Sequence, residues 1–241
     1  MTMSVLTPSA ILSDVVLRNV SLLPVLNRFG IPAGLGNATV SEICVQHNID
    51  LRFFLFVANN YLDPSYSGLL TLTNEHIRLT VDYLERANAD YLRTQIPNIR
   101  IHLSSFLKRS NPDPAVSENI MKFLTELEQT VTTNAERDAK ELFPKFRKMQ
   151  EDVAFRIQDW SYNTKETTEE DGFGTSMNIV EDLMQILIRY IKGTFDRNLL
   201  HGVIFALSTF RNDLESNSRL RVRVFFPIVN ALKQQLDDQK K

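Results

Sequence analysis

The sequence predicts an all-α fold, with a small helical domain over 1–65 and an antiparallel four-helix bundle over 66–241. Only 8 of the 241 residues are Gly, and the chain is rich in Leu, Ile and long polar side chains, which favour helix over sheet. From about residue 71, apolar residues recur mostly in steps of three and four, the period of an amphipathic helix. A hydrophobic content of 43% and a charged content of 23% are those of an ordinary globular protein.

The first 65 residues contain short helix signals separated by tight turns. The stretch "LLPVLNRFG" (22–30) ends in a Gly stop, and Thr39 is followed three residues later by Glu42, as in a capping box. The stretch "LRFFLFVANNYL" (51–62) is apolar and aromatic. We expect it to pack the small domain on the bundle; the alternative is an interface with another chain or a homodimer partner.

Four longer helical tracts follow, and short links between long amphipathic tracts are typical of an antiparallel bundle. The tracts are expected at about 74–107, 115–160, 176–192 and 197–237, with an acidic loop at 163–172. The predicted buried stripes run through Ile77, Val81, Leu84, Asn88, Tyr91, Ile99 and Phe106; Phe123, Leu127, Val131, Asn134, Asp138, Leu142, Phe146 and Met149; Val180, Leu183, Leu187 and Ile191; and Val203, Leu207, Phe210, Leu214, Asn217, Arg221, Val224 and Ile228.

Polar residues interrupt these stripes near the middle of the tracts. They are Asn88, Asn134, Asp138, Asn217 and Arg221. A buried polar group without a partner costs about 1–3 kcal/mol, and a charge costs more. We therefore expect these five side chains to meet one another. The alternative is that a stripe is drawn one residue out of phase, which would place the polar side chain at the edge of the buried face.

Two of the tracts repeat one pattern, "NAERDAKELFP" (134–144) and "NSRLRVRVFFP" (217–227). In both, an Asn lies ten residues before a Pro. The two residues directly before that Pro are Leu and Phe in the first copy and two Phe in the second. Four residues after the Asn comes Asp138 in the first copy and Arg221 in the second.

This repeated pattern resembles that of the hemerythrin-like domains, four-helix bundles in which facing helices carry H-x-x-x-E followed by F-P. Almost the whole chain is similar to one branch, the iron–sulfur cluster repair di-iron proteins, which also have a small helical N-terminal domain. The stretches 23–50 and 82–99 carry further parts of the resemblance. It implies a hemerythrin-like bundle and, in the family, a di-iron centre held by His and Glu.

The residue types at the matching positions differ from the family's ligands. The family's His positions fall at Asn88, Asn134, near Phe173 and at Asn217, its Glu positions at Asp138 and Arg221, and its N-terminal Cys pair at Gly34 and Leu35. Iron at such sites needs imidazole nitrogens and carboxylate oxygens, whereas Asn offers a neutral carbonyl oxygen and Arg adds positive charge. We therefore expect no metal ligands and no cofactor. The alternative is iron, or a hard cation such as Mg²⁺, at an unconventional site around Asp138.

In place of the metal, we expect Asp138 and Arg221 to form a buried ion pair flanked by Asn88, Asn134 and Asn217. A guanidinium has five donors, enough for one carboxylate and two amide oxygens. Such a cluster gives little net stability but fixes the register of the helices. Side chains more than about 6 Å apart, beyond any direct hydrogen bond, would contradict this pair.

The expected function is therefore non-enzymatic, as a regulatory, sensing or protein-interaction module. The alternative is a metalloprotein of iron–sulfur cluster repair or stress response. No catalytic residue is predicted, because Cys44 lies in an amphipathic helix and fits a core position. The four histidines are scattered, and only His47 has an acidic residue or another His three or four positions away, namely Asp50.

Composition limits the partners and the compartment. A net charge of −2 gives no general attraction to nucleic acid, and no apolar run approaches the length of a membrane span. A single cysteine excludes an intramolecular disulfide and a Cys cluster, which favours the cytoplasm. A protein partner or a homodimer remains compatible with these numbers.

Overall fold

The computed structural model describes residues 5–66, 74–110, 112–152, 172–192, 194–226 and 228–230, and it is mostly helical. Within these ranges there is no β-strand, only one isolated bridge between Ile11 and Thr39. The prediction of an all-α protein is confirmed. None of the described helices is both long enough and apolar enough to cross a membrane.

The chain forms two compact units. The first unit comprises residues 1–87, 142–169 and 216–241, and the second comprises 88–141 and 170–215. The first unit thus contains the N-terminal helices together with segments of the longer tracts. The domain boundary predicted between residues 65 and 66 stays a prediction.

Short helices with local caps build the N-terminal part of the first unit. The capping box is confirmed: the Glu42 backbone N–H donates to Thr39 Oγ1 at 3.3 Å, and the Thr39 N–H donates to Glu42 Oε2 at 2.7 Å. Asp50 caps the next helix by accepting from the Phe53 N–H at 2.8 Å. The elements are α1 (Leu12–Arg18), the 3₁₀ turn η1 (Val20–Leu22), α2 (Leu23–Arg28), α3 (Val40–Gln46) and α4 (Leu51–Leu62).

The apolar run of α4 lies in the core of the first unit. Phe53 and Phe54 are buried and pack edge-on against the Phe29 ring, with centroids 5.9 and 5.1 Å away. The same apolar cluster includes Leu84 of α5 and Phe225 of the last helical tract. Packing within this unit therefore accounts for the aromatic run, and the interface alternative gains no support from it.

The four longer tracts lie within a few residues of their predicted ranges as far as they are described. Residues 163–171 of the loop predicted at 163–172, and the chain beyond residue 230, lie outside the described residues. The elements are α5 (Asn74–Asp90), η2 (Tyr91–Gln95), α6 (Ile96–Ser110), α7 (Pro114–Arg137), η3 (Asp138–Leu142), α8 (Phe143–Asp152), α9 (Phe173–Arg189), α10 (Arg197–Leu220) and η4 (Arg221–Phe225).

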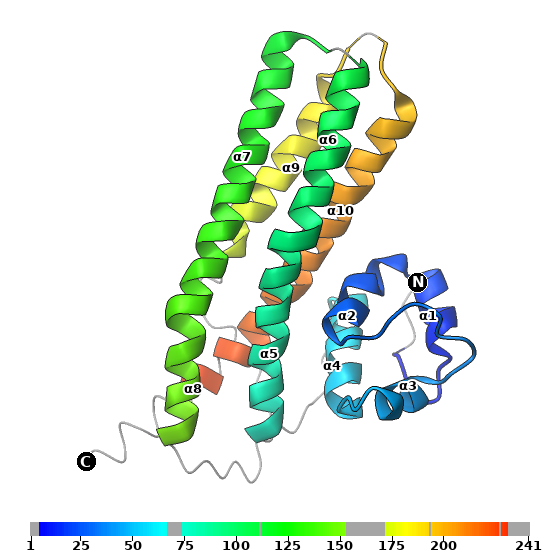
Figure 1. The fold of residues 1–241 in the computed structure, drawn as a ribbon, viewed down its shortest axis with the longest axis vertical. Coiled ribbons are helices and arrows are strands. Elements are labelled where there is room, and N and C mark those ends of the chain that lie inside the picture. The colour runs from blue at the N-terminus through cyan, green and yellow to red at the C-terminus, as the bar shows by residue number, and fades with distance from the viewer. Residues whose placement is uncertain are drawn as a thin grey trace. The chain divides into compact units, whose positions relative to one another are not determined.

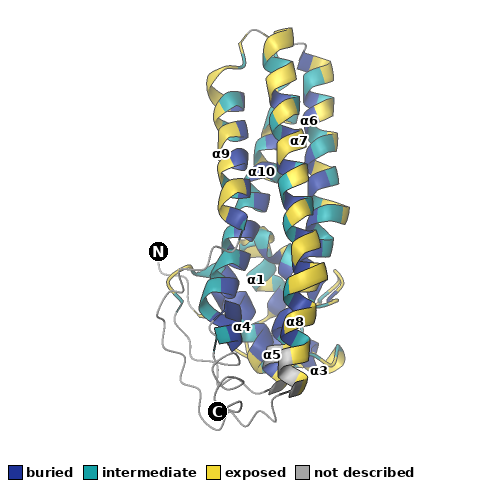
Figure 2. Ribbon diagram, turned by 90° about the vertical axis from the view of Figure 1, so that its left-hand side faces the viewer, coloured by how far each residue is buried: buried dark blue, intermediate teal, exposed yellow. Residues whose placement is uncertain are grey.

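Within the second unit, α6, α7, α9 and α10 run side by side (Figure 1). Helix α7 packs most extensively against α9. The buried faces of these helices turn toward one another and the exposed faces turn outward (Figure 2). Leucines dominate the interior, as at Leu103, Leu124, Leu183 and Leu207.

Three of the long tracts change from α- to π-helix at η2, η3 and η4. Each π-segment ends two residues before a proline in the sequence, namely Pro97, Pro144 and Pro227. A proline has no N–H for the α-helical bond, and its ring clashes with the carbonyl four residues earlier. The wider π-turn, with i→i+5 bonds, relieves this conflict before the proline.

The predicted stripe of the second tract is wrong by one residue at three positions. The predicted stripe steps four residues from Phe123 to Leu127 and three from Val131 to Asn134, whereas the buried face steps three and then four at these two places, and η3 adds a further shift. The buried residues are Leu124 in place of Phe123, Ala135 in place of Asn134, and Phe143 in place of Leu142. Ile191 lies beyond α9 and is half-buried, and the side chains of Ile77 and Met149 lie outside the described residues.

Candidate functional site

The second unit contains a buried carboxylate that receives a hydrogen bond from another helix. Asn88 Nδ2, from α5, donates to Asp138 Oδ2, at the start of η3, over 3.0 Å. The two residues are only 7% and 1% exposed. Arg137 places a guanidinium nitrogen 3.6 Å from Asp138 Oδ1 while the rest of its side chain is nearly half exposed. The carboxylate thus has a neutral donor on one oxygen and a cation near the other.

Asn134 is directed elsewhere, to the beginning of α9. Its Nδ2 donates to the Gly172 carbonyl oxygen at 2.6 Å, and the residue is half-buried. Gly172 has a φ of +80°, and a Cβ there would lie 2.9 Å from an Arg137 guanidinium nitrogen. Glycine is therefore favoured at this position both by its backbone conformation and by the space around it.

Aromatic rings fill the place where the resemblance puts the third His. Phe173 is 2% exposed, and its ring packs edge-on against Tyr91, with centroids 6.0 Å apart. Tyr91 also packs edge-on against Phe210, at 5.5 Å. Three rings offer no metal ligand in this part of the second unit, since the Tyr91 hydroxyl is directed to the Asp213 carbonyl oxygen at 3.5 Å.

The first unit contains a buried guanidinium bonded within its own helix. Arg221 is fully buried, and its Nε donates to Asn217 Oδ1, one turn earlier, at 3.3 Å. Its guanidinium carbon lies 5.9 Å from the centroid of the Phe143 ring, within the range of a cation–π interaction. The positive charge is therefore placed between an amide oxygen and an aromatic face.

The five predicted residues are accordingly grouped as two pairs and one separate residue. Asn88 pairs with Asp138 in the second unit, Asn217 pairs with Arg221 in the first, and Asn134 bonds to the α9 start. The Asp138–Arg221 ion pair links residues of different units and stays a prediction.

Sequence reasoning missed a second buried carboxylate in the second unit. Asp213 is fully buried, and its Oδ2 accepts a hydrogen bond from Gln95 Nε2 at 2.6 Å. The signal was present in the sequence, because Asp213 lies three residues after Phe210 and four before Asn217 on the α10 stripe. It also missed His76, which is buried and has its Nε2 3.3 Å from an oxygen of Asp50.

The donor set at the former ligand positions does not fit a di-iron centre. It consists of three amides, one carboxylate and one guanidinium, whereas iron prefers imidazole and several carboxylates. Across the described ranges, no three or more His, Cys, Asp or Glu side chains are grouped so that they could share a metal ion.

Cys44 has the environment of a core residue. It is 1% exposed, and burial raises the pKa of its thiol to about 11. The reactive thiolate is therefore scarce at neutral pH, since nucleophilic cysteines have a lowered pKa.

Comparisons of the chain with protein-family models, with curated proteins and with solved structures give no match. The resemblance to hemerythrin-like proteins therefore depends on the residue patterns alone.

Proposed function

We propose that the chain is a hemerythrin-like four-helix bundle protein with a small N-terminal domain, in which polar side chains have replaced a di-iron centre. In this proposal it is a non-enzymatic regulatory, sensing or interaction module of the cytoplasm. Its target is another protein or a second copy of the chain, and neither nucleic acid nor a membrane.

The observation that carries this proposal is the bonding of Asp138. It is the one carboxylate at the former ligand positions, and its oxygens are already in reach of the Asn88 amide and the Arg137 guanidinium. A metal ion would have to displace the amide and tolerate the cation. The neighbouring His-to-Asn and Glu-to-Arg differences also weaken metal binding, because the first removes a nitrogen ligand and the second removes a negatively charged ligand.

In this proposal the Asn88–Asp138 pair and the Asn217–Arg221 pair stand in for the metal ligands, and Asn134 bonds separately to the start of α9. Two opposite charges that leave water lose several kcal/mol of hydration each, and their attraction roughly returns this cost. Such a cluster contributes specificity more than stability: it penalises helix registers that would leave one of the charges alone.

Metal analysis tests the proposal. The protein is produced in iron-supplemented medium, purified without chelators and analysed by inductively coupled plasma mass spectrometry, with circular dichroism to verify folding. We expect well below one metal ion per folded chain. An Asp138→Asn variant and an Asp182→Asn control, which changes an exposed carboxylate of α9, are measured in parallel.

Two outcomes decide between the readings. Stoichiometric iron or manganese that is lost in Asp138→Asn and retained in Asp182→Asn would establish the alternative, an unconventional metal site of the repair type. Equal trace metal in all three proteins is bound nonspecifically and supports the metal-free proposal.

A further inference from the structure

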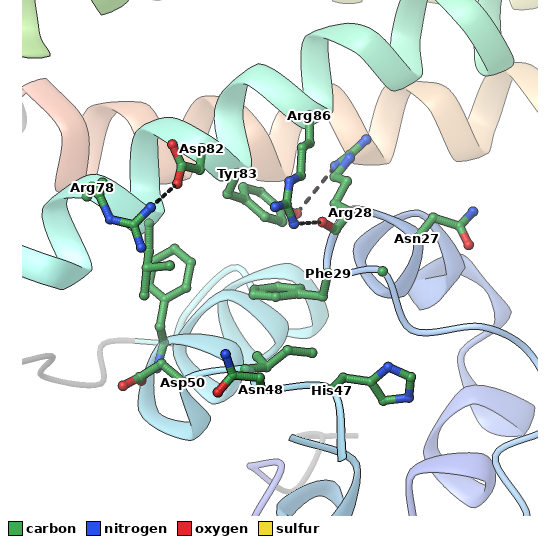
Figure 3. A pocket seen from close by; sticks show the side chains of 14 residues that line it. Asn27, Arg28, Phe29, His47, Asn48, Asp50, Arg78, Asp82, Tyr83 and Arg86 are labelled. Atoms are coloured by element: carbon green, nitrogen blue, oxygen red, sulfur yellow. Dashed lines mark hydrogen bonds and ion pairs between the residues drawn. The ribbon is translucent and has the colours of Figure 1, made fainter. Parts of the chain in front are cut away.

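A cavity of about 610 Å³ in the first unit has charged side chains that are bonded to other groups of the same unit. It lies between the end of α2, the turn before α4 and one face of α5 (Figure 3). Arg78 donates to Asp82 at 2.7 Å, and Arg86 donates to the backbone carbonyl oxygen of Arg28 at 2.8 Å. Arg28 itself donates to the Tyr83 hydroxyl at 3.3 Å. These side chains serve the packing of the first unit, whereas the second unit has a groove with an exposed apolar end.

This groove lies between α9 and α10 and encloses about 400 Å³. Its lining includes Met184, Ile188 and Arg189 of α9 and Arg211 of α10. The Arg211 guanidinium lies 3.8 Å from the Glu181 carboxylate, so this ion pair links the two helices. The pair also fixes which residues of α9 and α10 lie at the same level.

Exposed apolar side chains lie at one end of the groove. Ile188 is 65% exposed. Helices α9 and α10 run antiparallel (Figure 1), so Ile188, seven residues after Glu181, lies level with Ile204, seven residues before Arg211. Phe205 follows Ile204 and is 63% exposed. Neighbouring helices thus present Ile188 and Phe205 at one level, and apolar side chains beside a groove are typical of a surface that docks a partner helix.

Cations surround this apolar end. Residues 188–206 contain Arg189, Lys192 and Arg197 but one acid, Asp196, although the whole chain has a net charge of −2. Asp196 is used at the start of α10, where its Oδ1 accepts from two backbone N–H groups at 3.0 and 3.1 Å. Within the described parts of the chain, the three cations make no ion pair. An acidic partner segment therefore meets complementary charge here without displacing an internal ion pair of these cations.

We propose that the α9–α10 groove, with Ile188 and Phe205 at its end, docks an amphipathic helix of a protein partner whose polar face is acidic. Apolar side chains of that helix cover Ile188 and Phe205, and its carboxylates meet Arg189, Lys192 and Arg197. The inference rests on the proposed role as an interaction module and names the kind of partner. It uses none of the former ligand positions, so metal content and partner binding are separate measurements.

Fluorescence anisotropy of a labelled designed peptide, titrated with the full chain, tests this surface. The probe is an amphipathic helix of about 20 residues with Leu at positions i, i+3, i+4 and i+7 and Glu on the other face. We expect saturable binding that weakens as salt is added. Ile188→Ser should weaken it about tenfold or more, because serine removes apolar surface that the leucines bury. Arg189→Gln should weaken it less and should reduce the salt dependence.

Val45→Ser is the matched control, because Val45 is an 80% exposed apolar residue of α3 that does not line the groove. It should bind the probe like the unmodified chain, and circular dichroism verifies the fold of all variants. Equally tight binding of the same peptide with Lys in place of Glu would overturn the proposal. So would equally tight binding of a peptide with the same composition in scrambled order, or equal loss of binding in Val45→Ser and Ile188→Ser.

Two other occupants are tested with the same variants. Phosphatidylserine vesicles measure membrane binding, and multi-angle light scattering measures self-association. If the Glu peptide does not bind while Ile188→Ser abolishes binding to vesicles or disperses a dimer, the face belongs to a membrane or to a second copy, and the proposal is overturned. A folded chain that lacks metal and does not bind the peptide overturns this inference alone, and the metal-free proposal then stands.

Discussion

The segments 134–144 and 217–227 share one sequence pattern and handle opposite charges in different ways. Each places its charged residue, Asp138 or Arg221, at the first position of a π-segment. Arg221 bonds to Asn217 in its own helix, whereas Asp138 accepts its bond from Asn88 of α5. A guanidinium on a long side chain reaches an acceptor one turn earlier, but a short carboxylate depends on donors that other elements bring to it.

The largest expected effect tests whether the two segments act as one cluster. Asp138→Asn and Arg221→Met should each lower the free energy of unfolding by about 3–5 kcal/mol if the two charges are paired. The double variant should then lose clearly less than the sum of both changes. Guanidinium chloride unfolding measures all four proteins, and additivity within about 0.5 kcal/mol would contradict the pair.

Asn88→Ala should lower the free energy of unfolding by about 1–3 kcal/mol, because it removes the amide that donates to the buried Asp138. Asn178→Ala, an exposed position of α9, is the matched control and should change stability little. Urea unfolding measures both variants. Equal effects would mean that the Asn88–Asp138 bond does not stabilise the carboxylate.

Gly172→Ala should lower the free energy of unfolding by about 1–2 kcal/mol, because alanine is strained at a φ of +80° and its Cβ would clash with the Arg137 side chain. Gly174→Ala, two residues later within α9, should raise the stability slightly through helix propensity, because no atom beyond its chain neighbours and the adjacent helix backbone lies within 4 Å of its Cβ position. Thermal unfolding of the two variants should therefore shift in opposite directions. A shift in the same direction would refute the left-handed start of α9.

The smallest effect is expected for Asn134→Ala, which should lower the free energy of unfolding by about 0.5–1.5 kcal/mol. This variant removes the hydrogen bond to the Gly172 carbonyl oxygen, but Gly172 is half-buried, so water can replace the lost donor. The comparison with Asn88→Ala, in the same chemical unfolding series, ranks the two asparagines. A cost equal to or above that of Asn88→Ala would place Asn134 in the buried cluster, as its sequence position first predicted.

Local patterns predicted the helices well, because a capping box or a helix stop needs only a few neighbouring residues. Thr39 with Glu42 is the clearest case. Burial phase was less predictable, because steps of three and of four fit a 3.6-residue turn almost equally well. The predicted stripe was one residue out at Phe123 and Asn134, and η3 moved the core position from Leu142 to Phe143.

Contacts between distant segments could not be read from the sequence. Asn88 and Asp138 are 50 residues apart, and no local signal pairs an amide with one particular carboxylate. Arg28 at the end of α2 has the pattern of a solvated helix-terminal cation. Only the packing of α5 against it reveals a buried guanidinium beside a cavity.

The three π-segments change the angular phase of their helices. In an ideal α-helix, residues five apart point about 140° away from each other, so both cannot enter one core. Across η2, η3 and η4, such residues are nevertheless buried together: Tyr91 with Ile96, Asp138 with Phe143, and Arg221 with Phe226. A one-residue deletion inside a π-segment would therefore restore ideal α-periodicity and still keep the following aromatic or aliphatic side chain in the interior, because the two buried residues would then be four apart, about 40° around the helix.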